Sequence, residues 1–195
     1  MSNTKKNNTL WSSIGSLLFV VSIAISIYLG RIQSNLVQIH DFVYKKDADE
    51  IVDLFRKNYY WLTANPKTSP ETFVRTRAVT EDPSTTEKLT VKVLRENDKF
   101  AGFIAYYKKS FYLGYVLYLG VYEEFRGRGY GERLIRFAIE DLKKMNAKKI
   151  KLITRVKNNA ARSLYKKVGF KQTAIDDIKN IAEDNMHVYF EIDVN

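Results

Sequence analysis

The stretch Asn158 to Phe170, NNAARSLYKKVGF, decides the fold of this chain. Asn158 or Asn159 is suited to begin a helix, because an asparagine side chain accepts a hydrogen bond from an otherwise unpaired N–H of the first turn. Gly169 is suited to end it, since glycine readily adopts the left-handed conformation that follows helix C-termini. One face of this helix would carry Ala161, Leu164, Tyr165 and Val168. The pattern therefore predicts a short amphipathic helix with a tyrosine on its apolar face.

A glycine-rich turn, RGRGYG from Arg126 to Gly131, lies upstream of this helix. It follows a predicted strand that ends near Val121, and it opens a second predicted helix. Glycines let backbone N–H groups turn toward one point, and a helix N-terminus adds a partial positive charge. Together these features suit a pyrophosphate group. The glycines stand at alternate positions, so the turn matches neither a Walker A loop nor the G-x-G-x-x-G dinucleotide motif.

Strands and helices alternate on both sides of these two segments. The predicted strands are Val37–Tyr44, Leu89–Arg95, Phe100–Lys108, Tyr115–Val121, Lys149–Arg155 and Met186–Val194, of which the second and third form a hairpin. Asp47 is the predicted N-cap of one helix, and Ser69 with Pro70 opens another. The helix after the glycine-rich turn is predicted to bury Leu134, Ile135, Ala138, Ile139, Leu142 and Met145. This order indicates one mixed α/β domain.

The composition excludes several kinds of chemistry. The chain has no cysteine, which removes disulfides, thiolate nucleophiles and thiolate metal sites. Its two histidines, His40 and His187, are near no other obvious metal ligands, so no metal site is predicted. The net charge of +10 is concentrated between Leu142 and Lys171, where eleven lysines and arginines occur without an acid. This basic run is either a solvated surface or a surface for a polyanionic ligand, anionic lipid or nucleic acid.

The two quoted segments together resemble the GNAT N-acetyltransferase superfamily. The family's pyrophosphate loop, Arg or Gln-x-x-Gly-x-Gly or Ala, matches Arg126, Gly129 and Gly131. Its later motif, Asn-x-x-Ala-x-x-Leu-Tyr-x-x-x-Gly-Phe, matches Asn158, Ala161, Leu164, Tyr165, Gly169 and Phe170. The resemblance covers roughly residues 37–193. It implies an α/β fold with a mixed, mostly antiparallel central sheet and flanking helices, and an acyltransferase that moves an acetyl group from acetyl-CoA to a primary amine.

The resemblance also implies a role for each matched residue. The backbone of Arg126, Gly127, Arg128, Gly129, Tyr130 and Gly131 would hold the pyrophosphate of acetyl-CoA. Leu119 and Val121 would pair with the pantetheine through their backbones, and Asn158 would belong to the same cofactor site. Tyr165 would lie beside the sulfur and protonate the leaving thiolate, for which its ordinary pKa of about 10 is suitable. The amine would attack the thioester directly, with both substrates held in line.

The acceptor amine, the general base and the oligomeric state stay open at this point. Glu123, Glu124 and a chain of water molecules are alternatives for the base. Ile153 stands where related ribosomal-protein N-terminal acetyltransferases carry a glutamate, which weakens a peptide N-terminus as the acceptor. The alternatives to an enzyme are a non-catalytic module that binds acyl-CoA at a membrane and a nucleic-acid-binding protein. The retained Tyr165 and glycines argue against the first, and no nucleic-acid partner is expected because the basic run lacks interleaved aromatic residues.

The N-terminus differs from the rest of the chain. Leu10 to Leu29 contains no charged residue over twenty positions, which is enough for a helix to cross a hydrocarbon core of about 30 Å. A cleaved signal peptide, with Ala24-Ile25-Ser26 as a loose cleavage site, is the alternative. We expect a tail at 1–9, a transmembrane helix at 10–30, a linker at 31–36 and the acetyltransferase domain at 37–195. Because acetyl-CoA is kept chiefly in the cytosol, we expect a single-pass membrane protein whose catalytic domain faces the cytoplasm.

Overall fold

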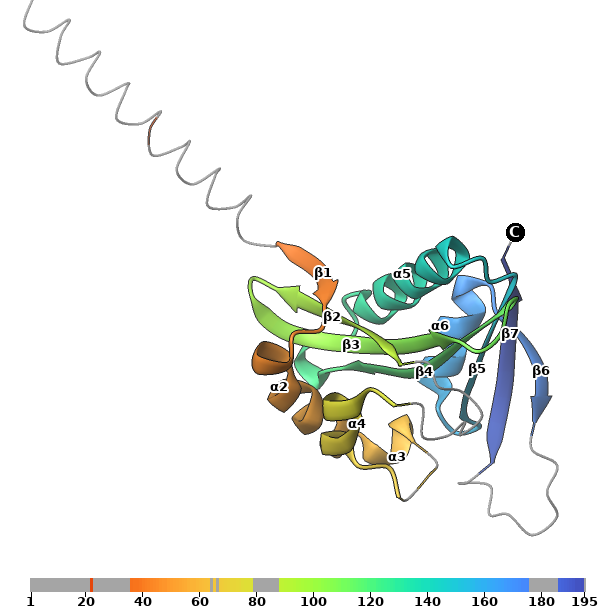
Figure 1. Ribbon diagram of the computed structural model, residues 1–195, viewed down its shortest axis with the longest axis horizontal. Helices are drawn as coiled ribbons and strands as arrows, with labels where there is room; N and C mark the ends of the chain where they lie inside the picture. Colours follow the sequence, from red (N-terminus) through yellow and green to blue (C-terminus); the bar gives the residue numbers. More distant parts are fainter. Residues whose placement is uncertain are drawn as a thin grey trace, which may run out of the picture. The chain divides into compact units, whose positions relative to one another are not determined.

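The computed structural model describes residues 22, 36–63, 65, 67–78, 88–175 and 186–194 (Figure 1). The chain divides into two compact units. The smaller comprises Met1–Val37 with Glu96–Asp98, and within it the Leu36 N–H donates to the Asn97 side chain at 3.0 Å. The larger comprises Gln38–Arg95 with Lys99–Asn195 and contains the helices discussed below.

In the described residues, seven strands form one sheet in the order β1-β2-β3-β4-β5-β7-β6. The strands are β1 (Val37–Asp41), β2 (Thr90–Glu96), β3 (Lys99–Lys108), β4 (Leu113–Val121), β5 (Lys149–Arg155), β6 (Lys171–Ile175) and β7 (His187–Asp193). The helices are α2 (Tyr44–Lys57), α3 (Tyr59–Leu62), α4 (Pro70–Thr76), α5 (Tyr130–Lys144) and α6 (Asn159–Val168), with a 3-10 turn, η1 (Glu123–Phe125). β4 and β5 are parallel, whereas β3–β4, β5–β7 and β6–β7 are antiparallel. The predicted mixed, mostly antiparallel sheet is therefore confirmed.

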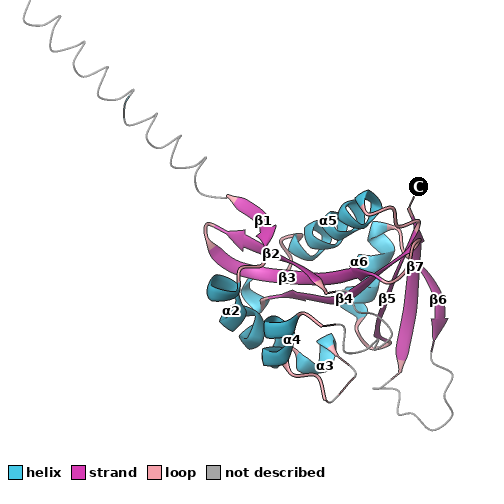
Figure 2. Ribbon diagram, viewed as in Figure 1, coloured by secondary structure: helices cyan, strands magenta, loops and turns pink. Residues whose placement is uncertain are grey.

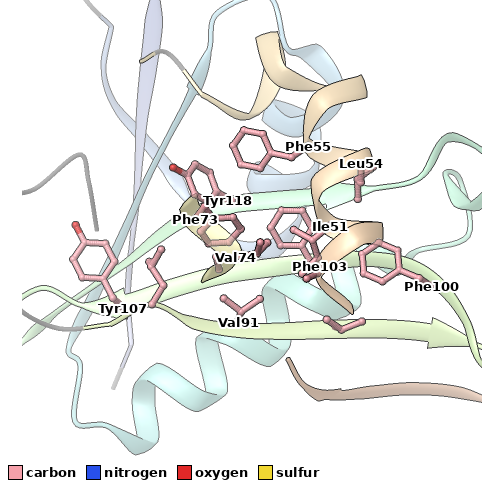
Figure 3. Close-up of a cluster of buried hydrophobic side chains, with 14 residues drawn as sticks. Ile51, Leu54, Phe55, Phe73, Val74, Val91, Phe100, Phe103, Tyr107 and Tyr118 are labelled. Carbon is pink, nitrogen blue, oxygen red and sulfur yellow. The ribbon is translucent and has the colours of Figure 1, made fainter. Parts of the chain in front are cut away.

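Helices cover both faces of the central strands. Figure 2 shows α5 on one side of β3 and β4, with α2 and α4 on the other. The core beneath α2 and α4 is rich in aromatic rings (Figure 3). The ring centroids of Phe55 and Tyr118 lie 5.0 Å apart, and those of Phe73 and Phe103 lie 6.0 Å apart. Each fully buried large apolar side chain contributes about 1.5–3 kcal/mol to stability, so this packing holds α2 firmly against β4.

Local signals predict most element boundaries well. The two-residue turn between β2 and β3 has positive φ at Asn97 and Asp98, the geometry of a type I′ hairpin turn. Ser69 is the N-cap of α4 with Pro70 following, and its hydroxyl accepts the Thr72 N–H at 3.1 Å. β5 has the predicted bounds. The predicted hairpin, the start of α4 and the strand before α6 are thus confirmed.

Other predicted boundaries are wrong, and each error has a physical cause. The first strand ends at Asp41, and α2 begins at Tyr44, so Asp47 is not an N-cap. Its buried carboxylate instead accepts the Val43 N–H at 2.7 Å and pairs with Arg95 at 2.8 Å. α5 ends before Met145, because Asn146 takes a positive φ and turns the chain.

Three described elements, β6, α3 and η1, were not predicted, and one prediction lies outside the described residues. β6 is exposed along its whole length and pairs only with β7, so its sequence has no buried alternation to reveal it. α3 is a single turn of four residues. The predicted transmembrane helix at 10–30 lies outside the described residues except for Ser22. Among the helices that the structure describes, none combines the length and apolarity that a bilayer crossing requires.

Candidate active site

The two parallel strands β4 and β5 separate partway along their length. Their pairing runs from Leu113 with Lys149 to Val116 with Leu152, but β4 continues to Val121 and β5 to Arg155. A cleft of about 740 Å³ opens beyond the last pair and is lined by both strands and by α3, α5 and α6. The separated strands leave room for an extended ligand to lie along β4 within the sheet.

A β-bulge at Leu117 marks the point of separation. Ala105 of β3 pairs with Tyr118 and Tyr106 pairs with Val116, so Leu117 is an extra residue in β4. Gly114 lies against Leu142 of α5, whereas Gly120, six residues later, lies against Leu54 of α2. In a regular strand these two glycines would share a face. The bulge therefore reverses the face of the sheet on which the side chains of the last residues of β4 lie. Leu117, Leu119 and Val121 line the cleft.

The glycine-rich turn closes one end of the cleft. Gly127 and Gly129 have φ angles of +76° and +80°, and Gly129 is the N-cap of α5. A Cβ atom at either position would meet no atom within 4 Å, so the backbone there faces open space. The first amides of a helix lack intrahelical acceptors and carry a partial positive charge. This end of the cleft is therefore suited to an anion.

The Arg126 side chain anchors this turn to the rest of the domain. Its Nε–H donates to the Val121 carbonyl at 3.2 Å, and its terminal N–H donates to the Asn58 Oδ1 at 2.7 Å. Asn58 stands at the junction of α2 and α3 and itself lines the cleft. Arg128 is not among the lining residues; its guanidinium lies 5.2 Å from the Phe125 ring. Sequence analysis missed Asn58, because no motif marks it.

Tyr165 and Asn158 lie at the α6 side of the cleft. The Tyr165 ring packs against Phe170 at 6.0 Å and Phe190 at 5.7 Å, and it is buried except where it meets the cleft. Burial raises the pKa of its hydroxyl. Asn158 is the N-cap of α6, and its side chain accepts the Ala161 N–H at 3.2 Å. The structure thus brings together one set of predicted residues in one cleft: Leu119, Val121, Arg126, Gly127, Gly129, Tyr130, Gly131, Asn158 and Tyr165.

A buried arginine that sequence analysis missed supports the α3 wall of the cleft. Arg155, at the end of β5 and only 7% exposed, donates its Nε–H to the Tyr60 carbonyl at 2.6 Å and a terminal N–H to the Thr63 carbonyl at 3.3 Å. Its guanidinium also lies 4.0 Å from the Tyr60 ring centroid. Trp61 and Leu62, on the turn held in this way, line the cleft. Nothing in the local sequence around position 155 predicts this contact.

The charges around the cleft are mostly basic. Among its described lining residues the one carboxylate is Glu132, which pairs with Lys167 at 2.6 Å and Arg136 at 2.9 Å. The hydrogen bond from Lys167 and then that from Arg136 lower the pKa of Glu132. Glu123 and Glu124, considered above as bases, are exposed on η1 and do not line the cleft. The described cleft therefore offers an anion site and a tyrosine, and it contains no evident carboxylate base.

Known proteins share this architecture. The model of the acetyltransferase (GNAT) family matches residues 48–170. N-alpha-acetyltransferase 30 of Schizosaccharomyces pombe is 32% identical over 82 residues, 40% of this chain and 55% of that protein, so the chain spans about half the length of this relative. The structure of Ard1 from Thermoplasma volcanium has a TM-score of 0.64 at 19% identity, covering 82% of this chain and 98% of its own. A Bacillus subtilis acetyltransferase solved in complex with CoA has a TM-score of 0.60 at 21% identity, covering 83% and 99%.

Proposed function

Because the chain belongs to the acetyltransferase (GNAT) family and is an acyltransferase, we propose that it transfers an acetyl group from acetyl-CoA to a primary amine by direct attack. One observation carries this proposal: the separation of β4 and β5 after Val116 creates a cleft with an anion site at one end and Tyr165 at its side. A ligand that has a diphosphate and a long, extended arm matches both the shape and the charge of this cleft.

The residues of the cleft fit the parts of acetyl-CoA. The positive φ angles of Gly127 and Gly129 and the open space beside them suit a pyrophosphate held by backbone N–H groups. The end of β4 beyond Val116 suits an extended chain that pairs with its backbone. Lys157 and Lys167, from the basic run, add positive charge at the cleft. This fit supports acetyl-CoA as the co-substrate.

Tyr165 is the proposed general acid. Acetyl-CoA supplies an activated thioester, and the thiolate that leaves it must gain a proton to become the thiol. The ordinary pKa of a tyrosine, about 10, already keeps its hydroxyl protonated at neutral pH, and burial raises the pKa of Tyr165 further, so the proton is present for donation to the thiolate. Packing against Phe170 and Phe190 fixes its ring without using the hydroxyl. A backbone N–H near Val121 is the proposed stabiliser of the negative charge that develops on the carbonyl oxygen.

The acceptor is proposed to enter along the wall formed by α3 and β5. Trp61, Leu62 and Ile153 make this wall largely apolar. Since the described cleft has no carboxylate apart from the ion-paired Glu132, we propose that water removes the proton from the amine.

Thiol release from acetyl-CoA in the presence of a library of small amines and peptides tests the proposal. We expect amine-dependent release with at least one class of acceptor, and mass spectrometry should find that acceptor heavier by one acetyl group. The matched control is Tyr165→Phe, which keeps the ring and removes the hydroxyl. Acetyl-CoA binding by the wild-type chain with no thiol release for any acceptor would instead favour a non-catalytic module.

We also propose that residues 10–30 anchor the chain in a membrane, with the domain from residue 37 in the cytoplasm. The support is the sequence alone: Leu10 to Leu29 has no charge, and Lys5, Lys6 and Arg31 flank it. Fractionation with protease protection on intact cells tests both points. Recovery of the full-length chain from the soluble fraction would reject the anchor, and digestion of the domain from outside the cell would reject the orientation.

A further inference from the structure

The turn between β3 and β4 exposes two neighbouring aromatic side chains. Phe111 is 83% exposed, the most of any large hydrophobic side chain that the structure describes, and Tyr112 is 55% exposed. Burying a phenylalanine is favourable by about 1.5–3 kcal/mol, so the fold gains nothing from leaving these rings in water. Single exposed apolar residues are common, whereas two adjacent exposed rings in one turn mark a candidate interaction surface.

Backbone hydrogen bonds hold this turn in place. The N–H groups of Lys109 and Ser110 donate to the Leu113 carbonyl at 2.8 and 3.2 Å. The Tyr112 carbonyl accepts the N–H groups of Lys148 and Lys149 at 2.7 and 3.1 Å. The turn between α5 and β5 therefore braces the turn between β3 and β4, and both lie at one end of the sheet (Figure 1). The turn that carries the two rings is therefore fixed by backbone hydrogen bonds, both within itself and to the neighbouring turn.

Lysines occur in this turn and in the neighbouring segment between α5 and β5. The Lys108 ammonium lies 5.6 Å from the centroid of the Phe111 ring. Lys109 is in the turn itself, and Lys144 and Lys148 are exposed where α5 leads into β5. The nearby acids are Glu191 and Asp193, which pair with Lys149, and Glu140 and Asp141 on α5, of which Asp141 accepts the Tyr106 hydroxyl at 2.6 Å. The turn itself, residues 108–112, has two lysines and no acid, so its own charge is positive. We name Lys108, Lys109, Phe111, Tyr112, Lys144 and Lys148 the aromatic-lysine tip.

The tip is separate from the cleft. β4 begins at Leu113, beside the tip, and its last residue, Val121, lines the cleft. From the first to the last of the nine residues of this strand there are about eight steps of roughly 3.3 Å, or about 26 Å. A partner bound to the tip would leave the cleft open to acetyl-CoA and the acceptor.

We propose that the aromatic-lysine tip docks on the surface of an anionic lipid bilayer. Tyr112, with an apolar ring and a polar hydroxyl, is a residue type that favours the boundary between headgroups and acyl chains, and the apolar ring of Phe111 is of the kind that enters this boundary. Lysines beside them attract anionic headgroups, at about 1 kcal/mol for each residue near the surface. The rings project from the apex of a turn, a convex shape that enters a soft interface. A nucleic acid would instead require a basic groove with stacking platforms along it. The proposal holds whether or not residues 10–30 form an anchor.

The absence of cysteine permits a sharp test with the full chain. Ser110→Cys, labelled with a fluorescent probe, reports on the tip, and Ser163→Cys reports on the exposed side of α6 as a matched control. Each labelled protein is reconstituted with vesicles of phosphatidylglycerol and phosphatidylcholine, or of phosphatidylcholine alone, that contain a nitroxide-labelled lipid. We expect the lipid to quench the probe at 110 in the anionic vesicles, with much less quenching in the zwitterionic ones. The probe at 163 should show little quenching in either kind of vesicle.

Variants of the tip, high salt and a measurement of acetyl-CoA affinity complete the test. Replacing Phe111 with Ser, or Lys108 and Lys109 with Gln, should lower the quenching at 110, as should 1 M salt, at which the Debye length is about 3 Å. Acetyl-CoA affinity should be unchanged in these variants. Equal quenching at 110 and 163 in both kinds of vesicle overturns the proposal. A response of the probe at 110 to single-stranded RNA without a response to vesicles overturns it too, and identifies a nucleic-acid surface.

Discussion

Replacing Arg155 with Met should release the α3 wall while leaving the cofactor end of the cleft intact. Methionine keeps much of the apolar stem but removes the guanidinium that binds the Tyr60 and Thr63 carbonyls at 2.6 and 3.3 Å. A hydrogen bond from a charged donor contributes about 1.5–3 kcal/mol. The longer bond, to the Thr63 carbonyl, contributes an energy near the lower limit of this range. The contact with the Tyr60 ring adds about 0.5–2 kcal/mol. The substitution also removes the energetic cost of burying a charged guanidinium, which offsets part of the lost stabilisation. We therefore expect a net loss of about 2–4 kcal/mol in the free energy of unfolding.

Urea unfolding measures the loss of stability, and two other readouts show which part of the cleft the substitution of Arg155 affects. The emission of Trp61, measured in a chain whose other tryptophan is replaced (Trp11→Phe), should shift further toward that of a solvated indole, because this residue of α3 lines the cleft and is only 45% exposed. The KM for the amine should rise more than kcat falls, while calorimetry should find acetyl-CoA affinity nearly unchanged. Arg155→Lys keeps the charge and should give an intermediate result.

Arg56→Met is the matched control, since this arginine forms an exposed pair with Glu71. Exposed pairs contribute about 0–1 kcal/mol, so its stability should barely change. If Arg155→Met had the stability and Trp61 emission of the wild type, the argument that Arg155 holds α3 would be refuted.

Four further predictions concern the cleft, its tyrosine and the helix caps. Gly129→Val places a side chain at φ +80°, which costs about 1–2 kcal/mol, and should weaken acetyl-CoA binding by about tenfold or more. Gly169→Val, at φ +109° and outside the cleft, should lose comparable stability and keep its affinity in calorimetry. Tyr165→Phe should keep acetyl-CoA binding and lower kcat by about 10²- to 10⁴-fold; an unchanged kcat, with chemistry rate-limiting, makes Tyr165 a core residue. Because burial raises the pKa of Tyr165, its contribution to stability is present below about pH 10, the pKa in the unfolded chain, and is lost at higher pH. The pH profile of wild-type kcat should accordingly show no loss from this group up to about pH 10. Ser69→Ala removes the acceptor of the Thr72 N–H and should cost about 1 kcal/mol in thermal unfolding; no change would mean that Pro70 alone starts α4.

The sequence by itself determined the features that depend on near neighbours along the chain. Asn158 and Gly169 bound α6 as predicted, because a cap satisfies N–H or carbonyl groups within a few residues of itself. The hairpin turn at Asn97 and Asp98 and the positive φ at Gly129 are local for the same reason. Most of the residues predicted for the cofactor belong to such segments or to the adjacent end of β4, and all of them except Arg128 line the cleft.

Only the tertiary structure decided how these segments form a site. The bulge at Leu117 depends on the register of β4 against β3. Arg126 reaches Asn58, 68 residues away, and Arg155 reaches Tyr60, 95 residues away. Asp47, predicted as a cap, is held by Arg95, 48 residues along the chain. No local preference encodes these partners, because such contacts form only after the sheet has brought together segments that are distant in the sequence.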